Sequence, residues 1–113
     1  MSRNLLTNAP PHAVQATLER LGADLRVARL RRNWSIAQVA ERIGAGVRAV
    51  ADAEKGKPTT AIVVYTALLW AYGLIDDVNL LAAPERDAEG QALAAVRAPK
   101  RSSSPRGALD DDF

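Results

Sequence analysis

Few side chains in this sequence could perform catalysis or hold a metal ion. His12 is the only histidine and follows two prolines, and the chain has no cysteine. No serine stands near a plausible base, so a catalytic triad cannot be assembled, and thiolate metal sites are excluded. The acidic run Asp110–Asp112 lies in a segment that has no scaffold for coordinating a cation. We therefore expect no enzymatic activity, no metal site and no cofactor.

Positive charge is concentrated in the first two thirds of the chain. Residues 1–73 hold ten Lys/Arg against five Asp/Glu (+5), residues 74–96 hold one against five (−4), and the last seventeen residues hold four against three (+1). The net charge over all 113 residues is +2. This asymmetry indicates one part that faces a polyanion and another that faces a different partner.

Length and composition favour a single small domain inside the cell. A chain of 113 residues predicts about one domain. The absence of cysteine suits a reducing cytoplasm. The N-terminus is too polar and too rich in proline for a signal peptide, and no apolar run approaches the roughly 20 residues that a bilayer requires. We expect a cytoplasmic protein that does not enter the membrane.

A long amphipathic helix is predicted after Pro11. Apolar residues recur there at three- and four-residue steps as far as Arg32. Asn33 then stands where a left-handed residue commonly ends a helix, and Trp34 is predicted to fill the core. The apolar stripe of this helix consists of Val14, Leu18, Leu21, Leu25 and Ala28.

A second, short helix is predicted to begin at Ser35. Ser35 and Gln38 have the S-x-x-Q spacing of a capping box, in which each side chain satisfies a backbone N–H at the start of the helix. Its inner face is formed by Ile36, Val39, Ala40 and Ile43.

A third short helix follows the Gly-Ala-Gly turn at residues 44–46. Gly44 can take the positive φ that ends the preceding helix. Val50 and its apolar neighbours carry the new helix from Val47 to Glu54, and Gly56 stops it.

A fourth helix is predicted over residues 62–72. The β-branched run at residues 62–64 would permit a strand, but the sequence has no second strand candidate to pair with it. Thr59 or Thr60 is expected to cap its start, and Gly73 ends the helix. Trp70 and Tyr72 could belong to the core or to a dimer surface, and the core is the preferred assignment.

The remainder of the chain is predicted to be helical and then disordered. Residues 74–81 form a short fifth helix and residues 85–96 a modest additional one. Residues 98–113 combine serine, proline and charge with little apolar surface, which is typical of a disordered tail.

Two helices of about two turns each cannot be stable alone. Short helices that cross through a small glycine-containing turn are typical of a helix-turn-helix, in which one braces against the phosphate backbone and the other enters the major groove. Residues 21–81 resemble the XRE/Cro helix-turn-helix family of phage-type repressors. The resemblance lies in LGADLRVARLRRNWS, Val39-Ala40, Ile43-Gly44, Val50 and Glu54-Lys55-Gly56-Lys57.

This resemblance implies an all-α fold: a five-helix, lambda-repressor-like helix-turn-helix domain with a short C-terminal extension and a disordered tail. Residues 1–84 would form the DNA-binding domain with an N-terminal helix extension, residues 85–97 a helical or irregular extension, and residues 98–113 the tail. This fold requires a small side chain at Ala40, because the two short helices cross closely there and a larger one would hold them apart.

The resemblance also implies base contacts from Val47, Arg48 and Asp52. Arg48 would donate to guanine O6 and N7, and Val47 would touch a thymine methyl. Asp52 would accept from cytosine N4 or orient Arg48, or it would be an ordinary solvated carboxylate. Arg29 would reach Glu54 in a partly buried, structural ion pair.

Phosphate contacts are implied along the same surface. Expected contributors are the start of the second helix, the cations after the third, and the start of the fourth. These residues are Ser35, Gln38, Lys55, Lys57, Thr59 and Thr60. Arg31 and Arg32 would add further contacts or would complement the helix dipole. The sequence departs from the family at Ile36, at Ala45-Gly46, where the usual N-cap side chain is missing, and at Ala49 and Ala51. These changes leave few polar groups for base recognition.

The expected role is a sequence-specific transcriptional regulator, most simply a repressor, that binds a double-stranded DNA operator as a homodimer. The dimer interface is assigned to the apolar residues Leu74, Ile75, Val78 and Leu81. Residues 80–101 are similar to C-terminal extensions of HipB-type antitoxins, which implies autoregulation and a HipA-like kinase toxin as partner. The alternatives are a phage-type or stand-alone repressor, and a helix-turn-helix adaptor that binds protein and not DNA.

Overall fold

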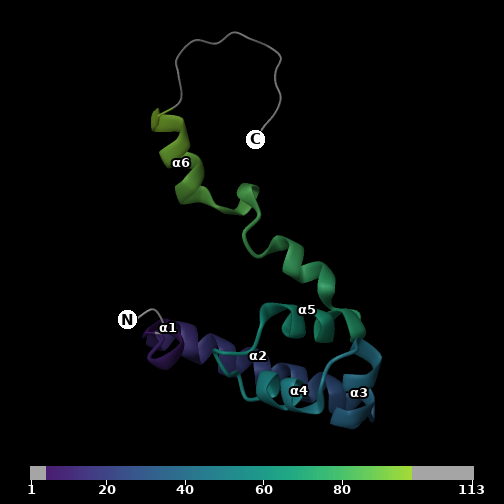
Figure 1. The fold of residues 1–113 in the computed structure, drawn as a ribbon. Coiled ribbons are helices and arrows are strands. Elements are labelled where there is room, and N and C mark those ends of the chain that lie inside the picture. The colour runs from purple at the N-terminus through teal and green to yellow at the C-terminus, as the bar shows by residue number, and fades with distance from the viewer. Residues whose placement is uncertain (1–4, 98–113) are drawn as a thin grey trace. The chain divides into compact units, whose positions relative to one another are not determined.

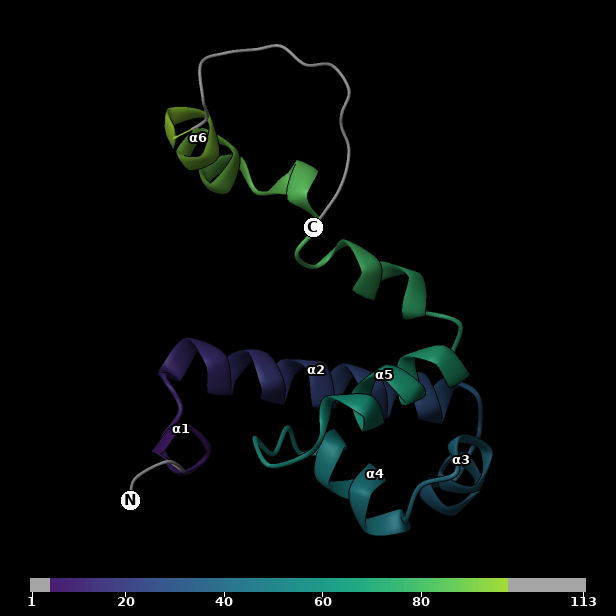
Figure 2. The same cartoon turned by 45° about the horizontal axis from the view of Figure 1, so that its top comes forward.

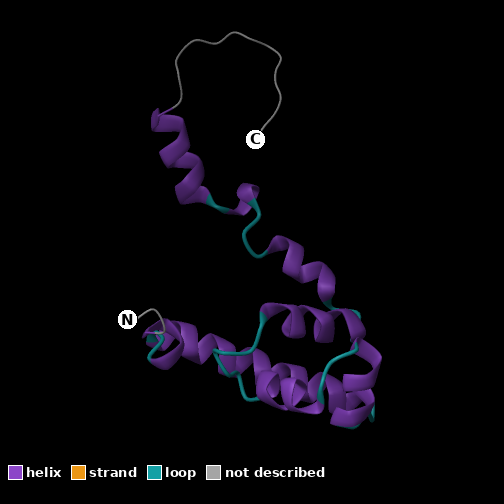
Figure 3. Cartoon of the chain, in the orientation of Figure 1, coloured by secondary structure: helices purple, strands orange, loops and turns teal. Residues whose placement is uncertain are grey.

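The computed structural model describes residues 5–97, and every regular element among them is helical (Figures 1 and 3). The predicted all-α class is therefore confirmed. By their contacts, the residues divide into two compact units, one up to Asn79 and one from Leu80. The elements in chain order are α1 (Leu5–Asn8), α2 (His12–Arg31), α3 (Ile36–Ile43), α4 (Val47–Glu54), α5 (Ile62–Ala71), the 3₁₀ helices η1 (Ile75–Leu80) and η2 (Pro84–Arg86), and α6 (Ala88–Arg97).

The predicted tail at residues 98–113 lies outside the described residues. The predicted domain boundary after residue 84 stays a prediction.

Local sequence signals set the ends of the first helices as predicted. Pro11 occupies the N-cap of α2, and Asn33 takes the left-handed conformation just after the helix, with φ 58°. At α3, Ser35 Oγ accepts from Gln38 N (3.0 Å), while Gln38 Oε1 accepts from Ser35 N (2.8 Å). Gly44 ends α3 with φ 76°.

The helix α4 begins without a capping side chain. Gly46 is its N-cap and has no side chain to accept the free N–H groups at the helix start. The helix ends just before Gly56, which has φ 71°. Both features agree with the sequence predictions, and they make α4 dependent on its packing.

The core lies where α2, α3, α4 and α5 meet. Val39 and Ala40 of α3 belong to the same buried cluster as Val50 and Ala53 of α4. Tyr65 Oη donates to Lys57 O (3.1 Å), which ties α5 to the loop after α4. Burial raises the pKa of Tyr65. The complete buried cluster is Leu25, Ala28, Val39, Ala40, Val50, Ala53, Tyr65, Leu68 and Tyr72.

Two glycines bring the end of α4 against the backbone of α2. A Cβ added at Gly22 would lie 2.5 Å from Ala53 O and 2.7 Å from Glu54 O. A Cβ added at Gly56 would lie 2.6 Å from the Cα of Glu19. Neither position has room for a side chain, because the obstructing atoms belong to the backbone. In both views of the fold, α3 lies near the C-terminal end of α2 (Figures 1 and 2).

Three sequence predictions for this unit are wrong. The N-cap of α5 is Ala61 and not Thr59 or Thr60, and no side chain caps that helix. Trp70 is 60% exposed, because it lies on the side of α5 opposite the buried Tyr65 and Leu68. Val14 is exposed as well, since the buried residues of α2 begin only at Gly22.

The helices toward the C-terminus also differ from expectation. The helix predicted over residues 74–81 is the shorter 3₁₀ helix η1, whose Asp and Asn residues have low helix propensity. The helix predicted over residues 85–96 is divided into η2 and α6. Between them, Asp87 Oδ1 accepts from Gly90 N (2.9 Å) and caps the start of α6.

Replacing Gly22 by alanine tests the close approach of α2 and α4. Gly→Ala in a helix interior usually stabilises by about 1 kcal/mol, but here we expect a loss of about 1–3 kcal/mol, because the new methyl group meets backbone. Gly46→Ser is the control, since a Cβ there meets nothing within 4 Å and the hydroxyl supplies the missing cap, for a gain of about a few tenths of a kcal/mol. Urea unfolding measures both changes. A Gly22→Ala protein as stable as the wild type would contradict the packing.

Candidate nucleic-acid interface

The candidate interface is built on the exposed sides of α3 and α4. Burial of Val50 and Ala53 turns the opposite side of α4 outward. Val47 is 53% exposed and Arg48 is exposed. Asp52 is half-buried. Figure 2 shows α3 and α4 as neighbouring short helices joined by a tight turn. This is the arrangement in which one helix can brace and the other can be inserted into a groove.

Arg48 is available for an external partner. It forms no hydrogen bond or ion pair with the residues from 5 to 97. A free guanidinium on the first turn of an exposed helix can make the bidentate contact that guanine offers in the major groove.

Asp52 is held by Lys57 and not by Arg48. Lys57 Nζ lies 3.5 Å from Asp52 Oδ1, and the backbone N–H of Lys57 donates to Asp52 O (3.1 Å). The Asp52 side chain is 22% exposed. Of the three roles considered for Asp52, the structure therefore supplies no contact for orienting Arg48, and it adds a fourth, that of positioning Lys57.

The start of α3 offers backbone donors. The capping box already occupies the N–H groups of Ser35 and Gln38. The N–H groups of Ile36 and Ala37 have no acceptor in the part of the chain that the structure describes. Such unpaired donors at a helix N-terminus form an anion-binding site. Ser35 and Gln38 thus cap this terminus, while Ile36 and Ala37, which lie between them, carry the free N–H groups.

The remaining predicted phosphate contacts follow α4. Lys55 and Thr59 are exposed, and Lys57 keeps 46% of its side chain exposed beside Asp52. Thr60 differs from them, because its Oγ1 is shielded from solvent and its N–H donates to Lys57 O.

Arg29 and Glu54 are brought together in a buried ion pair. Arg29 Nε donates to Glu54 Oε2 (2.7 Å) and Nη2 to Oε1 (3.0 Å), and the two side chains are only 8% and 6% exposed. Arg29 Nη1 also donates to Trp34 O (2.9 Å). The hydrogen bond with Glu54 raises the pKa of Arg29, although burial opposes it. One guanidinium thus joins the end of α4 to the link between α2 and α3.

Arg32 packs beside the same region, through a contact with Tyr72 that the sequence did not predict. It donates to Ala28 O (2.8 Å) and to Tyr72 O (2.8 Å), and its guanidinium lies 5.3 Å from the centre of the Tyr72 ring. Burial, together with the Glu54 carboxylate, raises the pKa of Tyr72 to about 12. Of the two roles considered for Arg32, the structure shows that of a helix-end cation.

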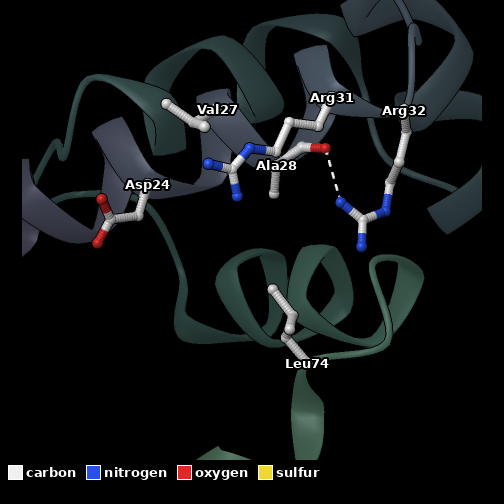
Figure 4. A pocket seen from close by; sticks show the side chains of 6 residues that line it. All are labelled: Asp24, Val27, Ala28, Arg31, Arg32 and Leu74. Carbon is white, nitrogen blue, oxygen red and sulfur yellow. Dashed lines mark hydrogen bonds between the residues drawn. The ribbon is translucent and has the colours of Figure 1, made fainter.

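Figure 4 shows Arg31 and Arg32 along α2, with Leu74 across a hollow of about 340 Å³. Arg31 is exposed there.

Trp34 contacts one aromatic ring and one cation. Its ring lies 6.0 Å from that of Tyr72 and under the guanidinium of Arg42 at 4.1 Å. The sequence predicted Trp34 as a core residue, and it packs partly buried against the core. The sequence did not predict the contact between Arg42 and Trp34, because it depends on the conformation that the arginine side chain adopts.

The predicted dimer residues are only partly exposed. Leu74 is 42% exposed, whereas Ile75 and Val78 are half-buried in the first unit. Leu81 is 78% exposed and belongs to the second unit.

Comparison with known proteins identifies the family. Residues 20–83, more than half of the chain, match the helix-turn-helix domain family. The chain therefore belongs to this family, and its fold fits a lambda-repressor-like helix-turn-helix domain. No curated protein and no solved structure matches the chain. None of the described helices is long and apolar enough to span a membrane. Within residues 5–97, no group of three or more His, Asp or Glu side chains could hold a metal ion.

Substituting Arg29 tests the buried ion pair. Arg29→Met should destabilise the protein by about 3–5 kcal/mol, because it leaves the Glu54 carboxylate buried without a partner. The pair Arg20–Asp24, whose side chains are 82% and 67% exposed, provides the matched control, since Arg20→Met should cost at most about 1 kcal/mol. Chemical denaturation gives both values. Similar losses in the two variants would show that the Arg29 pair contributes no more than a surface contact.

Proposed function

We propose that this protein is a sequence-specific, DNA-binding transcriptional regulator of the XRE type, most simply a repressor, that acts as a homodimer. The observation that carries the proposal is the exposed Arg48, unpaired among the described residues, on a short helix whose opposite side is buried in a helix-turn-helix core. Membership of the helix-turn-helix family supports it.

Base recognition is assigned to the outer side of α4. Arg48 donates to guanine, and Val47, which is 53% exposed, packs against a thymine methyl. Asp52 can accept from cytosine N4 through the carboxylate oxygen that does not contact Lys57. With alanines at residues 49 and 51, α4 has few polar side chains, so DNA shape contributes part of the specificity.

Phosphate binding is assigned to residues on either side of α4. The N–H groups of Ile36 and Ala37 at the start of α3 receive one phosphate. Lys55, Lys57 and Thr59 contact the backbone after α4. Two such surfaces in a two-fold dimer would recognise half-sites about 34–36 Å apart.

The particular biological role is inferred from residues that follow the helix-turn-helix. Similarity of residues 80–101 to HipB-type extensions supports an autoregulating antitoxin that binds a HipA-like kinase, and copurification with such a kinase encoded beside this gene would test it. A regulator without a toxin is the alternative. A helix-turn-helix adaptor is favoured only by the uncapped, alanine-containing α4.

A salt titration with DNA tests the proposal. Fluorescent duplexes selected from a randomised pool by the wild-type protein should bind with an affinity that falls by about 0.9 log units per log unit of salt for each phosphate neutralised. Arg48→Ala should reduce discrimination at one base pair by about 1–3 kcal/mol. Arg26→Ala, which removes an exposed arginine of α2, should leave base preference unchanged. Affinity independent of salt would favour the adaptor.

Asp52→Asn separates the two roles of Asp52. If the carboxylate positions Lys57, the substitution should leave base preference unchanged and alter affinity equally for all duplexes, because only a phosphate contact is affected. If it accepts from cytosine N4, preference at one base pair should change by about 1–3 kcal/mol. The same duplex pool distinguishes these outcomes, and Lys57→Met, which should lower affinity equally for all duplexes, provides the reference for the loss of a phosphate contact.

A further inference from the structure

The outer side of α5 is apolar and uncovered. Its sequence, IVVYTALLWA, contains no Asp, Glu, Lys or Arg. Tyr65 and Leu68 are buried in the core, yet Ile62 is 75%, Val63 66% and Trp70 60% exposed. A helix that is apolar on all sides is normally buried on all sides. Contiguous exposed apolar surface of this kind marks an interaction site.

The one hydroxyl on this side is satisfied within the helix. Thr66 Oγ1 lies 3.0 Å from Ile62 O and 3.1 Å from Val63 O, and donates to these carbonyls. A partner that covers Thr66 therefore leaves no hydroxyl donor unpaired. The desolvation penalty of a buried, unpaired polar group is avoided.

We propose that the outer face of α5, formed by Ile62, Val63, Thr66 and Trp70, packs against the same face of a second copy of this chain, with the two helices antiparallel. This inference rests on the homodimer of the proposed function and locates its interface. It moves the centre of that interface from residues 74–81 to Thr66 on α5, and Leu74, 42% exposed, remains at its edge.

Charge and spacing favour a second copy over an unlike partner. A two-fold interface places each patch against itself, so a charged patch would meet its own sign; α5 has no charged residue and avoids this repulsion. Ile62, Thr66 and Trp70 follow one another at four-residue steps and share one side of the helix. In an antiparallel pair centred on Thr66, the isoleucine of each copy faces the tryptophan of the other.

Trp70 should be the energetic centre of this contact. Tryptophan is enriched among the residues that dominate interface energetics. It also brings the largest apolar surface of the four side chains and an indole N–H that can remain at the wet edge.

Analytical ultracentrifugation of the full chain, without DNA, tests the proposal. The wild type should dimerise, and Ile62→Lys and Trp70→Glu should each raise the dimer dissociation constant by about thirtyfold or more. An equimolar mixture of the two variants should recover dimers, because each new charge then faces the opposite one. Val14→Lys, a charge placed on an exposed valine of α2 (43%), should leave the dimer intact. Circular dichroism checks that all variants keep their helix content.

Other outcomes would overturn the inference. A monomeric wild type, or variants that dimerise as tightly as the wild type, would place no second copy on α5. Loss of dimers in both variants without recovery in the mixture would exclude the antiparallel arrangement. Because the measurement uses no DNA, its failure leaves the salt-dependent binding of single duplex half-sites as a separate test of the proposed function.

Discussion

The structure depends on the close contact between α2 and the end of α4. Two glycines remove the side chains that would hold the backbones apart, since a Cβ at either Gly22 or Gly56 would overlap main-chain atoms of the other segment. The Arg29–Glu54 ion pair joins the same two helices through side chains. An eight-residue helix without a capping side chain is not stable alone, so this contact determines where α4 lies.

The buried ion pair contributes more to position than to net stability. Removing two charges from water costs much of what their attraction returns. Here the geometry is bidentate, and the same guanidinium also donates to Trp34 O. The arginine therefore fixes α4 and the α2–α3 link together. Trp34, which contacts both Tyr72 and Arg42, extends this packed region to the start of α3, where the free N–H groups lie.

The first unit thus offers two surfaces of opposite chemistry. Around α4 the exposed groups include cations and hydrogen-bond donors, among them Arg48 and Lys55, which suits the phosphates and base edges of the proposed DNA partner. On α5 the exposed groups are apolar and uncharged. Since both helices pack on one core through Val50, Ala53, Tyr65 and Leu68, the proposed dimer contact and the proposed DNA contact belong to one small structural unit.

Features that depend on neighbours in the chain were predictable from the sequence alone. The capping box at Ser35, the left-handed Asn33, the turn at Gly44 and the uncapped start of α4 each follow from local backbone chemistry. The family pattern added the side of α4 that carries Arg48. The lack of a pairing strand identified α5 as a helix, but an entirely apolar helix has no sequence signal for which side is buried.

Tertiary structure decided which side chains are exposed and which distant residues pair. Such contacts join residues that are far apart in the chain, or they select one of several possible partners. It left Trp70 exposed, placed Arg32 on the Tyr72 carbonyl, forty residues away, and paired Asp52 with Lys57. It also gave Gly22 its role, since a glycine inside a helix is explained only by the backbone that packs against it. Propensity and spacing describe a segment, whereas contacts such as these exist only after the segments have packed.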